Sequence, residues 1–326
     1  MFFLIYFSFS IPAEPTLKEE KSFLKWMRST NQIFTGESYF FRMQNYLNTV
    51  DLINKHNKDN ENYKLSSNQY SHLTPSELNS LFAFKNYKPH PRSTPRFSDF
   101  IPPESLDWRE NNTVTAIKNQ QTCGSCWSFA SVAVMESLLA RTEGSLRSLS
   151  SQSLLACCSS CNGCNGCDPT IALDWIIQKS NGSLPLEAFY PYYAIQKECD
   201  TTKFLNNTYG NLKSWDYVDF CNETDLMVKC AEYGPVLSVM KANLWSFIFY
   251  TGGIFYEEGC SQFDYDHAVA VVGYGSENEQ LFWIVKNSMG KEWGEEGYIR
   301  LARNKGNMCG IATRSIYVSN DPLTYS

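Results

Sequence analysis

The sequence predicts an α+β protein that carries an additional helical segment at its N-terminus. Three observations support this prediction. Apolar residues recur at helical spacing in the earlier part of the chain, short apolar runs bounded by glycine follow, and all twelve cysteines lie after residue 101. Helices followed by strands are typical of a helical half that faces a sheet half, and 326 residues suffice for about two packed units and a smaller one.

Residues 1–10 are predicted to form a secretory signal peptide. The apolar run at 2–11 has small residues at Ser8 and Ser10 and is followed by Pro12, which does not continue a helix. A run of about ten residues is half of what a membrane-spanning helix needs, so we expect no membrane span. The run contains no Lys or Arg, and a plain apolar tail is the alternative. Twelve cysteines independently favour the oxidising secretory pathway, ending in a lysosome-like compartment or outside the cell.

Residues 11–100 are predicted to be a helical prosegment. They contain no cysteine, and their apolar residues recur at helical spacing in two stripes: Phe23, Trp26 and Met27, then Phe41, Tyr46, Val50 and Ile53. The stretch 88–96 places three prolines and three basic residues together, which no helix or strand interior tolerates. We therefore expect an exposed linker that a protease can cut, ahead of a cross-linked mature body at 101–326.

The mature body is predicted to contain three helices and then four strands. A helix at 126–141 follows from the spacing of Trp127, Ala130, Val134 and Leu138, with Gly144 after its end. Two more helices are expected at 169–180 and at 223–233, the last with Asn222 as its N-cap. Short apolar runs are typical of antiparallel strands, and they occur at 236–240, 267–273, 282–286 and 297–302.

A reactive thiol is predicted at Cys126, in the first turn of the 126–141 helix. Unpaired N–H groups and the helix dipole lower the pKa of a thiol at such a position and favour the thiolate. Three of the four histidines lie in the prosegment, which leaves His267 as the candidate base. Asn287, at the end of the next strand, offers an amide that can hold the imidazole. These residues point to nucleophilic catalysis by a cysteine.

The same residues stand in three motifs that resemble those of the papain-like cysteine peptidases. The first motif places Gln120 six residues before Cys126 in Cys-Gly-Ser-Cys-Trp. The second is Asp-His-Ala around His267, followed by Gly-Tyr-Gly. The third is Asn-Ser-x-Gly from Asn287, followed by Trp-Gly-Glu-x-Gly-Tyr at 293–298. The three motifs occur in the family's order, and the resemblance extends over nearly the whole chain.

The prosegment is similar to the cathepsin-L type of this family. It has the helix signature Arg42, Tyr46, Ile53 and Asn57 and the following Asn68-x-Tyr70. The pattern prefers Glu, Asn and Asp at three positions where this chain has Ser38, Thr49 and His72. For 11–100 the resemblance implies a removable inhibitory propeptide.

The resemblance implies a papain-like two-subdomain fold, with a helical left half at about 110–213 and an antiparallel, β-barrel-like right half at about 214–326. It also implies a cysteine endopeptidase that is made as an inactive zymogen. The Cys126 thiolate would pair with the His267 imidazolium and form an acyl-enzyme. Asn287 would orient the ring, and Gln120 would donate to the oxyanion.

No cofactor and no metal are implied. The expected partners are protein and peptide substrates, the chain's own propeptide and cystatin-like inhibitors, and the expected state is a monomer. A net charge of −6 argues against nucleic acid, whose binders concentrate Lys and Arg. The alternative function is that of a catalytically silent relative, which would act only as a binding module.

Substrate contacts are expected from alignment to the family. Asn165 and Gly166 would bind the substrate, as would Trp293, for which a role in the core is the alternative. The main specificity pocket would be lined by Asp168, Pro169, Val239, Tyr265, Ala268 and, at its base, Arg314. A cation at the base either binds an acidic side chain or pairs with Asp168. Both cases predict reduced tolerance for arginine two residues before the scissile bond.

Three residues near the site depart from the family pattern. Met289 stands where a tryptophan usually shields the His–Asn hydrogen bond, so we expect modestly lower catalysis. Gln121 replaces a common glycine beside the oxyanion residue. Cys167 replaces a glycine of the substrate-binding segment and is expected to narrow the cleft.

The resemblance implies three disulfides, namely Cys123–Cys164, Cys157–Cys199 and Cys260–Cys309. A fourth, Cys221–Cys230, is inferred from proximity alone. With Cys126 free, eleven cysteines remain and cannot all pair, so at least one of Cys158, Cys161 and Cys167 stays unpaired.

Two other interpretations of the cysteines stay open. Cysteines recur every third residue at 158, 161, 164 and 167, as in iron–sulfur or zinc sites, although a secretory chain favours disulfides. Cys123 and Cys126 form a Cys-x-x-Cys pair, as in redox enzymes, but no thioredoxin-like βαβ pattern surrounds them.

Overall fold

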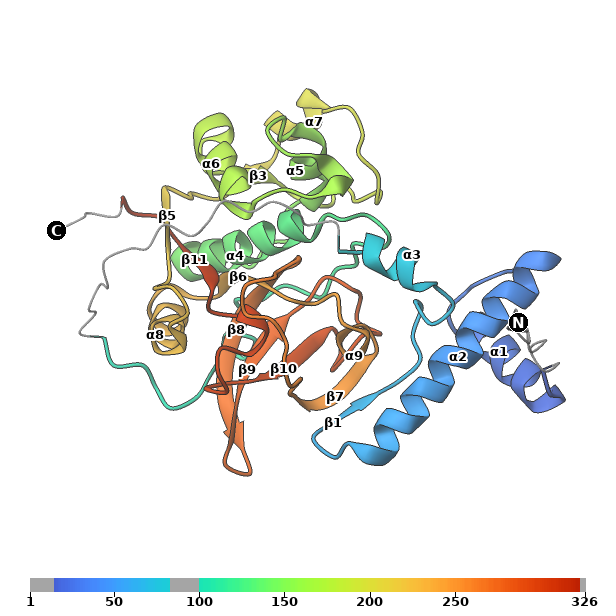
Figure 1. The fold of residues 1–326 in the computed structure, drawn as a ribbon. Coiled ribbons are helices and arrows are strands. Elements are labelled where there is room, and N and C mark those ends of the chain that lie inside the picture. Colours follow the sequence, from blue (N-terminus) through green and yellow to red (C-terminus); the bar gives the residue numbers. More distant parts are fainter. Residues whose placement is uncertain (1–14, 83–99, 323–326) are drawn as a thin grey trace, which may run out of the picture.

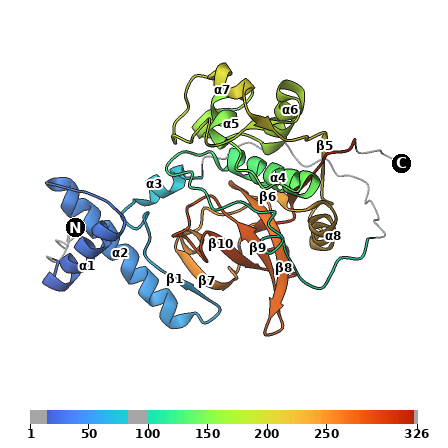
Figure 2. The same cartoon turned by 180° about the vertical axis from the view of Figure 1, so that it is seen from behind.

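The computed structural model describes residues 15–82 and 100–322. The predicted signal peptide (1–10) and the predicted linker (88–96) lie outside the described residues. Figure 1 shows two helices of the prosegment to one side of a larger body, and Figure 2 shows the same arrangement from behind. Within that body, a long central helix lies between a group of shorter helices and a sheet. The α+β class predicted from the sequence is confirmed.

The prosegment folds around an aromatic cluster between its first two helices. Its elements are α1 (Leu17–Ser29), α2 (Glu37–Asp59), β1 (Tyr63–Leu65) and α3 (Pro75–Ser80). Phe23 and Trp26 of α1 pack against Tyr46 of α2, with ring centroids 5.1–5.5 Å apart. The predicted second stripe is wrong at Phe41, whose side chain is 51% exposed, because Met43 occupies the inward position one turn before Tyr46.

The helical half surrounds one buried helix. It contains α4 (Cys126–Glu143), α5 (Ser151–Cys157), η1 (Gly163–Asn165), α6 (Pro169–Ser180) and α7 (Thr201–Leu205), with a short β3–β4 pair (Leu184–Pro185 and Thr208–Tyr209). Helix α4 packs against α6 on one side and against strand β8 (His267–Glu277) on the other. It ends at Gly144, whose φ of 68° favours glycine. The helices predicted at 126–141 and 169–180 are confirmed.

The sheet half is built on a nine-stranded sheet of the described residues with the order β1-β7-β10-β9-β8-β6-β11-β5, and β2 pairs with β8. The bounds are β2 (Leu106–Asp107), β5 (Ser214–Tyr217), β6 (Val236–Met240), β7 (Tyr250–Phe255), β9 (Gln280–Lys286), β10 (Tyr298–Ala302) and β11 (Arg314–Ser319). All of its pairs are antiparallel except β10 with β7. Helices α8 (Glu223–Tyr233) and α9 (Trp245–Ile248) and the short turn η2 (Met308–Gly310) complete this half.

The prosegment joins the mature body as an extra strand. Strand β1 pairs with β7, with Tyr63 opposite Gly253. Gly253 has a φ of 94°, and a Cβ there would lie 2.4 Å from the backbone oxygen of Asn62, so only glycine fits this close approach. The side chain of Asn68 adds a 2.7 Å hydrogen bond to the carbonyl of Ile248. The prosegment is thus held by backbone pairing as well as by its side chains.

Four disulfides are formed, and they include the three that the resemblance implied. The fourth is Cys161–Cys167, which leaves Cys158 as a thiol 2.9 Å from the Cys161 sulfur. Because Cys161, Cys164 and Cys167 are all in disulfides, they are not available as metal ligands. The described residues also contain no group of three or more His, Cys, Asp or Glu side chains that could hold a metal ion.

The pairing expected between Cys221 and Cys230 does not form, and both are thiols. Cys230 lies on the inward face of α8, with its sulfur 3.8 Å from the carbonyl oxygen of Val271. Cys221 precedes that helix, and its sulfur lies 3.6 Å from the hydroxyl of Thr313. The two side chains therefore face different neighbours, although they are nine residues apart in the sequence.

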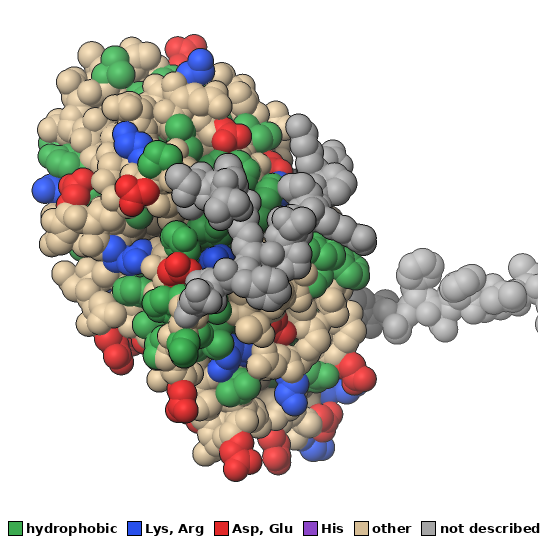
Figure 3. All heavy atoms as spheres, turned by 90° about the vertical axis from the view of Figure 1, so that its left-hand side faces the viewer, with side chains coloured by type: hydrophobic (Ala, Val, Ile, Leu, Met, Phe, Trp, Pro, Cys, Tyr) green, Lys and Arg blue, Asp and Glu red, His purple; other side chains and the backbone are tan. Residues whose placement is uncertain are grey.

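The surface has a mixed charge on the face that Figure 3 shows, where acidic and basic side chains are interspersed with apolar and uncharged ones. No helix in the described ranges 15–82 and 100–322 is both long and apolar enough to cross a membrane.

Candidate active site

The N-terminus of α4 places Cys126 between the two halves of the mature body. Its side chain is 1% exposed. Burial raises the pKa of the Cys126 thiol to about 12, although the backbone N–H groups of Ala268 and Trp127 face the sulfur and favour the thiolate. With the prosegment in place, burial thus favours the protonated thiol over the thiolate.

His267 begins strand β8, and its ring is held by Asn287. The Nε2 atom lies 2.8 Å from Oδ1 of Asn287, which also accepts the N–H of Ser288. Burial lowers the pKa of His267, and it outweighs the opposite effects of Asn287 and Asp266. The other ring nitrogen, Nδ1, makes no hydrogen bond within the described residues.

Gln120 is held by Ser288, the residue that follows Asn287. The hydroxyl of Ser288 donates to Oε1 of Gln120 at 2.6 Å, and the N–H of Gln120 donates to the carbonyl of Ser288 at 2.8 Å. Its Nε2 donates to the carbonyl of Cys123 at 3.0 Å. Because Ala268, next to His267, contacts the Cys126 sulfur, the structure brings the four candidate catalytic residues into one site.

Two residues of the prosegment cover this site, and no motif in the sequence pointed to them. The carbonyl oxygen of Leu81 lies 3.5 Å from Nε2 of Gln120. The ring of Phe82 contacts His267 edge to face, with centroids 5.3 Å apart. Both prosegment side chains are buried, so the catalytic candidates are shielded from solvent as long as the prosegment is bound. The only signal in the sequence is the short apolar run at 81–84, at the end of a polar segment.

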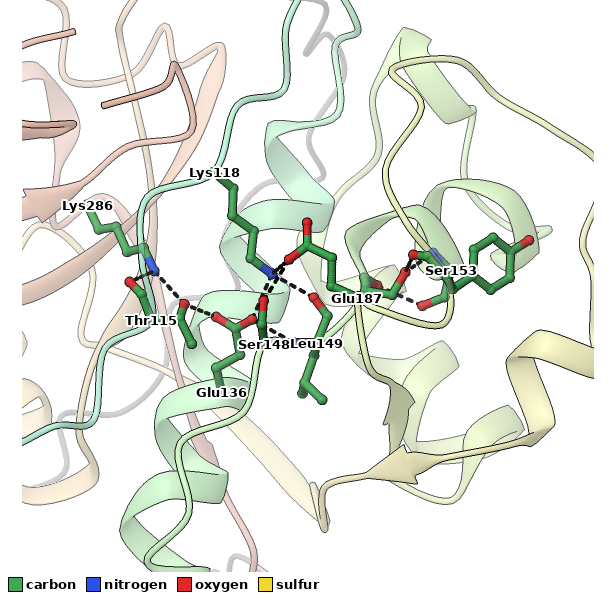
Figure 4. Close-up of polar contacts among 10 residues, drawn as sticks. Thr115, Lys118, Glu136, Ser148, Leu149, Ser153, Glu187 and Lys286 are labelled. Carbon is green, nitrogen blue, oxygen red and sulfur yellow. Dashed lines mark hydrogen bonds and ion pairs between the residues drawn. The ribbon is translucent and has the colours of Figure 1, made fainter. Parts of the chain in front are cut away.

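A buried polar network lies behind the site and joins the two halves (Figure 4). Lys286, at the end of β9, donates to the backbone and side chain of Thr115, whose hydroxyl donates to Glu136 on α4. Lys118 binds both Glu136 and Glu187, at 2.8 and 2.9 Å. Burial lowers the pKa of Lys286 to about 8, whereas for Lys118 the two carboxylates outweigh burial and raise the pKa. The network fixes the end of β9 directly before Asn287.

The residues expected to line the specificity pocket come together from both halves. Arg314 pairs with Val239 across β11 and β6, and Val239 pairs with Ala268 across β6 and β8, so the three lie in one row. From the helical half, Asp168 binds Nη2 of Arg314 at 2.5 Å, and Pro169 follows as the first residue of α6.

The remaining predicted substrate residues lie at three different places. Asn165 and Gly166 are in the turn before α6, beside the Cys123–Cys164 disulfide. Tyr265 comes two residues before His267 and packs against the core of the helical half. Trp293 is instead buried in the sheet half, where its indole N–H binds the carbonyls of Phe247 and Ile248.

Acid is expected to loosen the prosegment through His72. Burial against Trp26 and Phe34, together with the charge of Arg42, lowers the pKa of His72 to about 4. The unfolded segment takes up this proton near pH 6.5, so stability is lost as the pH falls from about 6.5 towards 4. The ion pair with Arg42 lowers the pKa of Glu77 to about 2. The contribution of Glu77 to the stability of the prosegment is therefore lost only below about pH 4.5.

Replacing His72 with asparagine should therefore move the loosening of the prosegment to lower pH by about one unit. Hydrogen exchange of residues 17–82, measured on an inactive variant between pH 7 and 4, reports this shift. His56→Asn changes another histidine of the same segment and serves as the matched control. Identical exchange profiles for wild type and His72→Asn would contradict the prediction.

The fold and this arrangement of cysteine, histidine and asparagine define a cysteine peptidase of the papain type that is covered by its own prosegment. A family model for the papain family cysteine proteases matches residues 102–319, and a model for the cathepsin propeptide inhibitor domain (I29) matches residues 23–78. The chain therefore belongs to the papain family of cysteine proteases. The resemblance inferred from the three motifs is confirmed.

Known proteins are similar over most of the chain. It is 34% identical over 305 residues to cathepsin L2 of Homo sapiens, and the match covers 90% of each protein. It is 38% identical over 291 residues to digestive cysteine proteinase 1 of Homarus americanus, covering 85% of this chain and 87% of that protein. The solved structure of digestive procathepsin L 3 from the larval midgut of Tenebrio molitor superposes with a TM-score of 0.83 at 32% identity, covering 94% of this chain and all of that one. The chain is thus a cysteine endopeptidase with an inhibitory propeptide.

Proposed function

We propose that Cys126, His267, Asn287 and Gln120 carry out peptide hydrolysis through an acyl-enzyme. The Cys126 thiolate attacks the peptide carbonyl carbon, and the oxyanion accepts hydrogen bonds from the Gln120 amide and the Cys126 N–H. His267 protonates the leaving amine and then takes a proton from the water that hydrolyses the acyl-enzyme. Asn287 keeps the imidazole in the orientation that both proton transfers need.

The observation that supports this assignment most strongly is the position of Cys126. Its sulfur lies in the first turn of α4 and faces the N–H of the residue that follows His267. With Nε2 of His267 bound to Asn287, Nδ1 is the nitrogen that remains to exchange a proton with the thiol. Departure of Leu81 and Phe82 returns solvent to the site, and this removes the burial that now favours the neutral pair.

Covalent labelling separates an active peptidase from a silent relative. After acid maturation, an epoxysuccinyl peptide inhibitor should label Cys126 stoichiometrically and abolish hydrolysis of a fluorogenic peptide. The full-length zymogen at neutral pH, in which the prosegment covers the site, should be labelled far more slowly. Mature protein that neither hydrolyses peptides nor reacts at Cys126 would support the binding-module alternative.

We further propose the division into a signal peptide at 1–10, a propeptide at 11–100 and a mature peptidase at 101–326, whose helical and sheet halves meet near residue 213. A secretory route to a lysosome-like compartment or to the exterior agrees with the four disulfides. A monomeric mature enzyme that binds cystatin-like inhibitors follows from the family membership as a proposal.

Specificity at the pocket is expected to depend on the Arg314–Asp168 ion pair. Both side chains are buried, and Tyr217 lies 3.2 Å from the same guanidinium nitrogen. Arg314→Met leaves the Asp168 carboxylate without its cation, so substrates with arginine two residues before the scissile bond should gain about tenfold in kcat/KM relative to leucine substrates.

A peptide library measured on mature wild type and Arg314→Met provides this ratio. Adding Asp168→Asn to the variant should remove the gain, and Tyr217→Phe is the control that retains the ion pair. Wild-type enzyme that prefers arginine at this position would contradict the assignment of Arg314 to the pocket.

Met289 is expected to limit the rate modestly. It is buried in the sheet-half core, and its carbonyl accepts a hydrogen bond from the prosegment residue Gln69. Met289→Trp should raise kcat of the mature enzyme by about threefold, because a larger ring excludes water from the His–Asn hydrogen bond. Turnover and melting temperature are measured together, since overpacking lowers stability. An unchanged kcat in a variant of normal stability would disprove this account of the position.

A further inference from the structure

The hydroxyl of Tyr192 lies between the two groups that the proposed mechanism uses to hold the oxyanion. It donates a 2.9 Å hydrogen bond to the main-chain carbonyl of Gln120 and lies 2.6 Å from the Ser125 hydroxyl. Since the single proton of Tyr192 is used on Gln120, the Ser125 hydroxyl is the donor in the second contact. Tyr192 therefore links the Gln120 loop to the residue immediately before Cys126.

Each contact fixes one of the two oxyanion donors. The Cys126 N–H belongs to the planar peptide unit that begins at Ser125, so holding Ser125 restricts the direction of that N–H. The Gln120 side chain projects from the residue whose carbonyl Tyr192 binds. Ser288 holds Gln120 from the sheet half, and Tyr192 holds it from the helical half. Within the helical half, Gln120 is also bound to Cys123, whose carbonyl accepts from its Nε2. The tyrosine hydroxyl adds the side-chain bridge from the Gln120 loop to Ser125.

Tyr192 is itself held in place. Its ring contacts Phe129 of α4 edge to face, with centroids 4.8 Å apart and an angle of 74° between the rings. Burial raises the pKa of its hydroxyl to about 12, which favours the neutral hydroxyl that donates to Gln120. A donor that is already in place when charge develops costs no reorganisation in the transition state.

We propose that Tyr192 is a positioning residue of this peptidase, which sets the spacing of the two oxyanion donors through its bridge between Gln120 and Ser125. The inference rests on the proposed function, because it assumes that Gln120 and the Cys126 N–H bind the oxyanion. Contacts that matter only in the transition state change kcat rather than KM. We therefore expect kcat to fall in parallel with the affinity of the site for an oxyanion.

Tyr192→Phe in the mature enzyme tests the proposal, because it removes only the hydroxyl. We expect kcat to fall about tenfold and KM to change by less than about twofold. The affinity for a peptide aldehyde, whose adduct with Cys126 carries the oxyanion, should fall by a similar factor. Alkylation of Cys126 by iodoacetamide forms no oxyanion, so its rate should stay within about twofold of wild type.

Tyr193→Phe is the matched control, since it removes the same hydroxyl from the neighbouring residue. The Tyr193 ring is exposed and lies beneath the ammonium group of Lys197, away from the oxyanion groups. All three measurements should equal those of wild type. In a Gln120→Ala background, Tyr192→Phe should reduce kcat much less than it does in wild type, because the two changes affect the same interaction.

Wild-type kcat in Tyr192→Phe, or an equal fall in alkylation and hydrolysis, would overturn the proposal. Gln120→Ala shows which assumption has failed. Full activity of Gln120→Ala would contradict the proposed function itself. If Gln120→Ala is inactive and Tyr192→Phe is fully active, only the role of Tyr192 is contradicted. If Tyr192→Phe does not fold, Ser125→Ala breaks the same chain of hydrogen bonds from the other end. Ser125→Ala must then lose hydrolysis while it keeps the wild-type rate of alkylation. If both rates fall equally, or neither falls, the inference is refuted.

Discussion

Replacing Cys126 with alanine is expected to reduce peptide hydrolysis by the acid-treated protein by at least about 10⁴-fold. Of the described thiols, only that of Cys126 faces the N–H after His267, so no other sulfur can form the acyl-enzyme there. A small residual rate is expected, because the oxyanion donors and the substrate contacts remain. Hydrolysis of a fluorogenic peptide after incubation at mildly acidic pH measures the loss.

The same variant reports on removal of the prosegment. Wild-type zymogen should lose roughly its first hundred residues on acidification, as expected for a domain of typical size that is joined by an exposed linker. Cys126→Ala should remain full-length when it is incubated alone and be trimmed when a trace of active enzyme is added. Cys221→Ala is the matched control, because it removes another free thiol, whose sulfur lies beside the hydroxyl of Thr313 and not beside the N–H after His267. Normal turnover in Cys126→Ala would refute the catalytic assignment.

Replacing Gln120 with alanine should lower kcat by about 10²–10³-fold. Its Nε2 lies near the carbonyl of Leu81, so a donor already faces a carbonyl oxygen at this point of the cleft. Alanine keeps the main-chain bond to Ser288 and removes the side-chain amide together with its bonds to the Ser288 hydroxyl and the Cys123 carbonyl. KM should change little, because the contact to the oxyanion exists only in the transition state.

A change at the next residue provides the control for Gln120. Gln121 is exposed and has a φ of 56°, and its backbone N–H, which alanine keeps, binds the side chain of Asn119. Gln121→Ala should therefore leave kcat within about twofold. Melting curves of both variants should agree with that of wild type within a few degrees. Unchanged turnover in Gln120→Ala, with normal folding, would remove this residue from the mechanism.

Local signals in the sequence were sufficient to predict the bounds of a helix where one residue caps its end. Helix α6 runs over Pro169–Ser180 as expected, because Asp168 caps its start and Asn181 adopts the left-handed conformation after its end. Asn222 caps α8 through two backbone N–H groups, as predicted. Strand β8 is longer than predicted, because a two-residue turn at 278–279 continues its pairing with β9 as far as Glu277.

Contacts between distant parts of the chain were not predictable from local patterns. The motifs identified Cys126, His267 and Asn287 because each stands in its own short signature. Tyr192 and Leu81 reach the same site from segments without such a signature, through a hydroxyl and a backbone oxygen. The Cys221–Cys230 pairing failed for the same reason, since spacing along the chain does not determine which way two side chains point on either side of a helix start.

Loss of the prosegment exposes a new edge strand of the sheet. Strand β7 is paired with β1 in the zymogen. Without β1 it becomes an edge strand, whose unpaired N–H and C=O groups another polypeptide could bind. The adjacent pair Gly252 and Gly253, the second with a φ of 94°, follows the first two residues of this strand. Glycine inside an exposed edge strand weakens regular pairing with another strand, so this pair makes β7 a poorer template for another polypeptide once the prosegment has left.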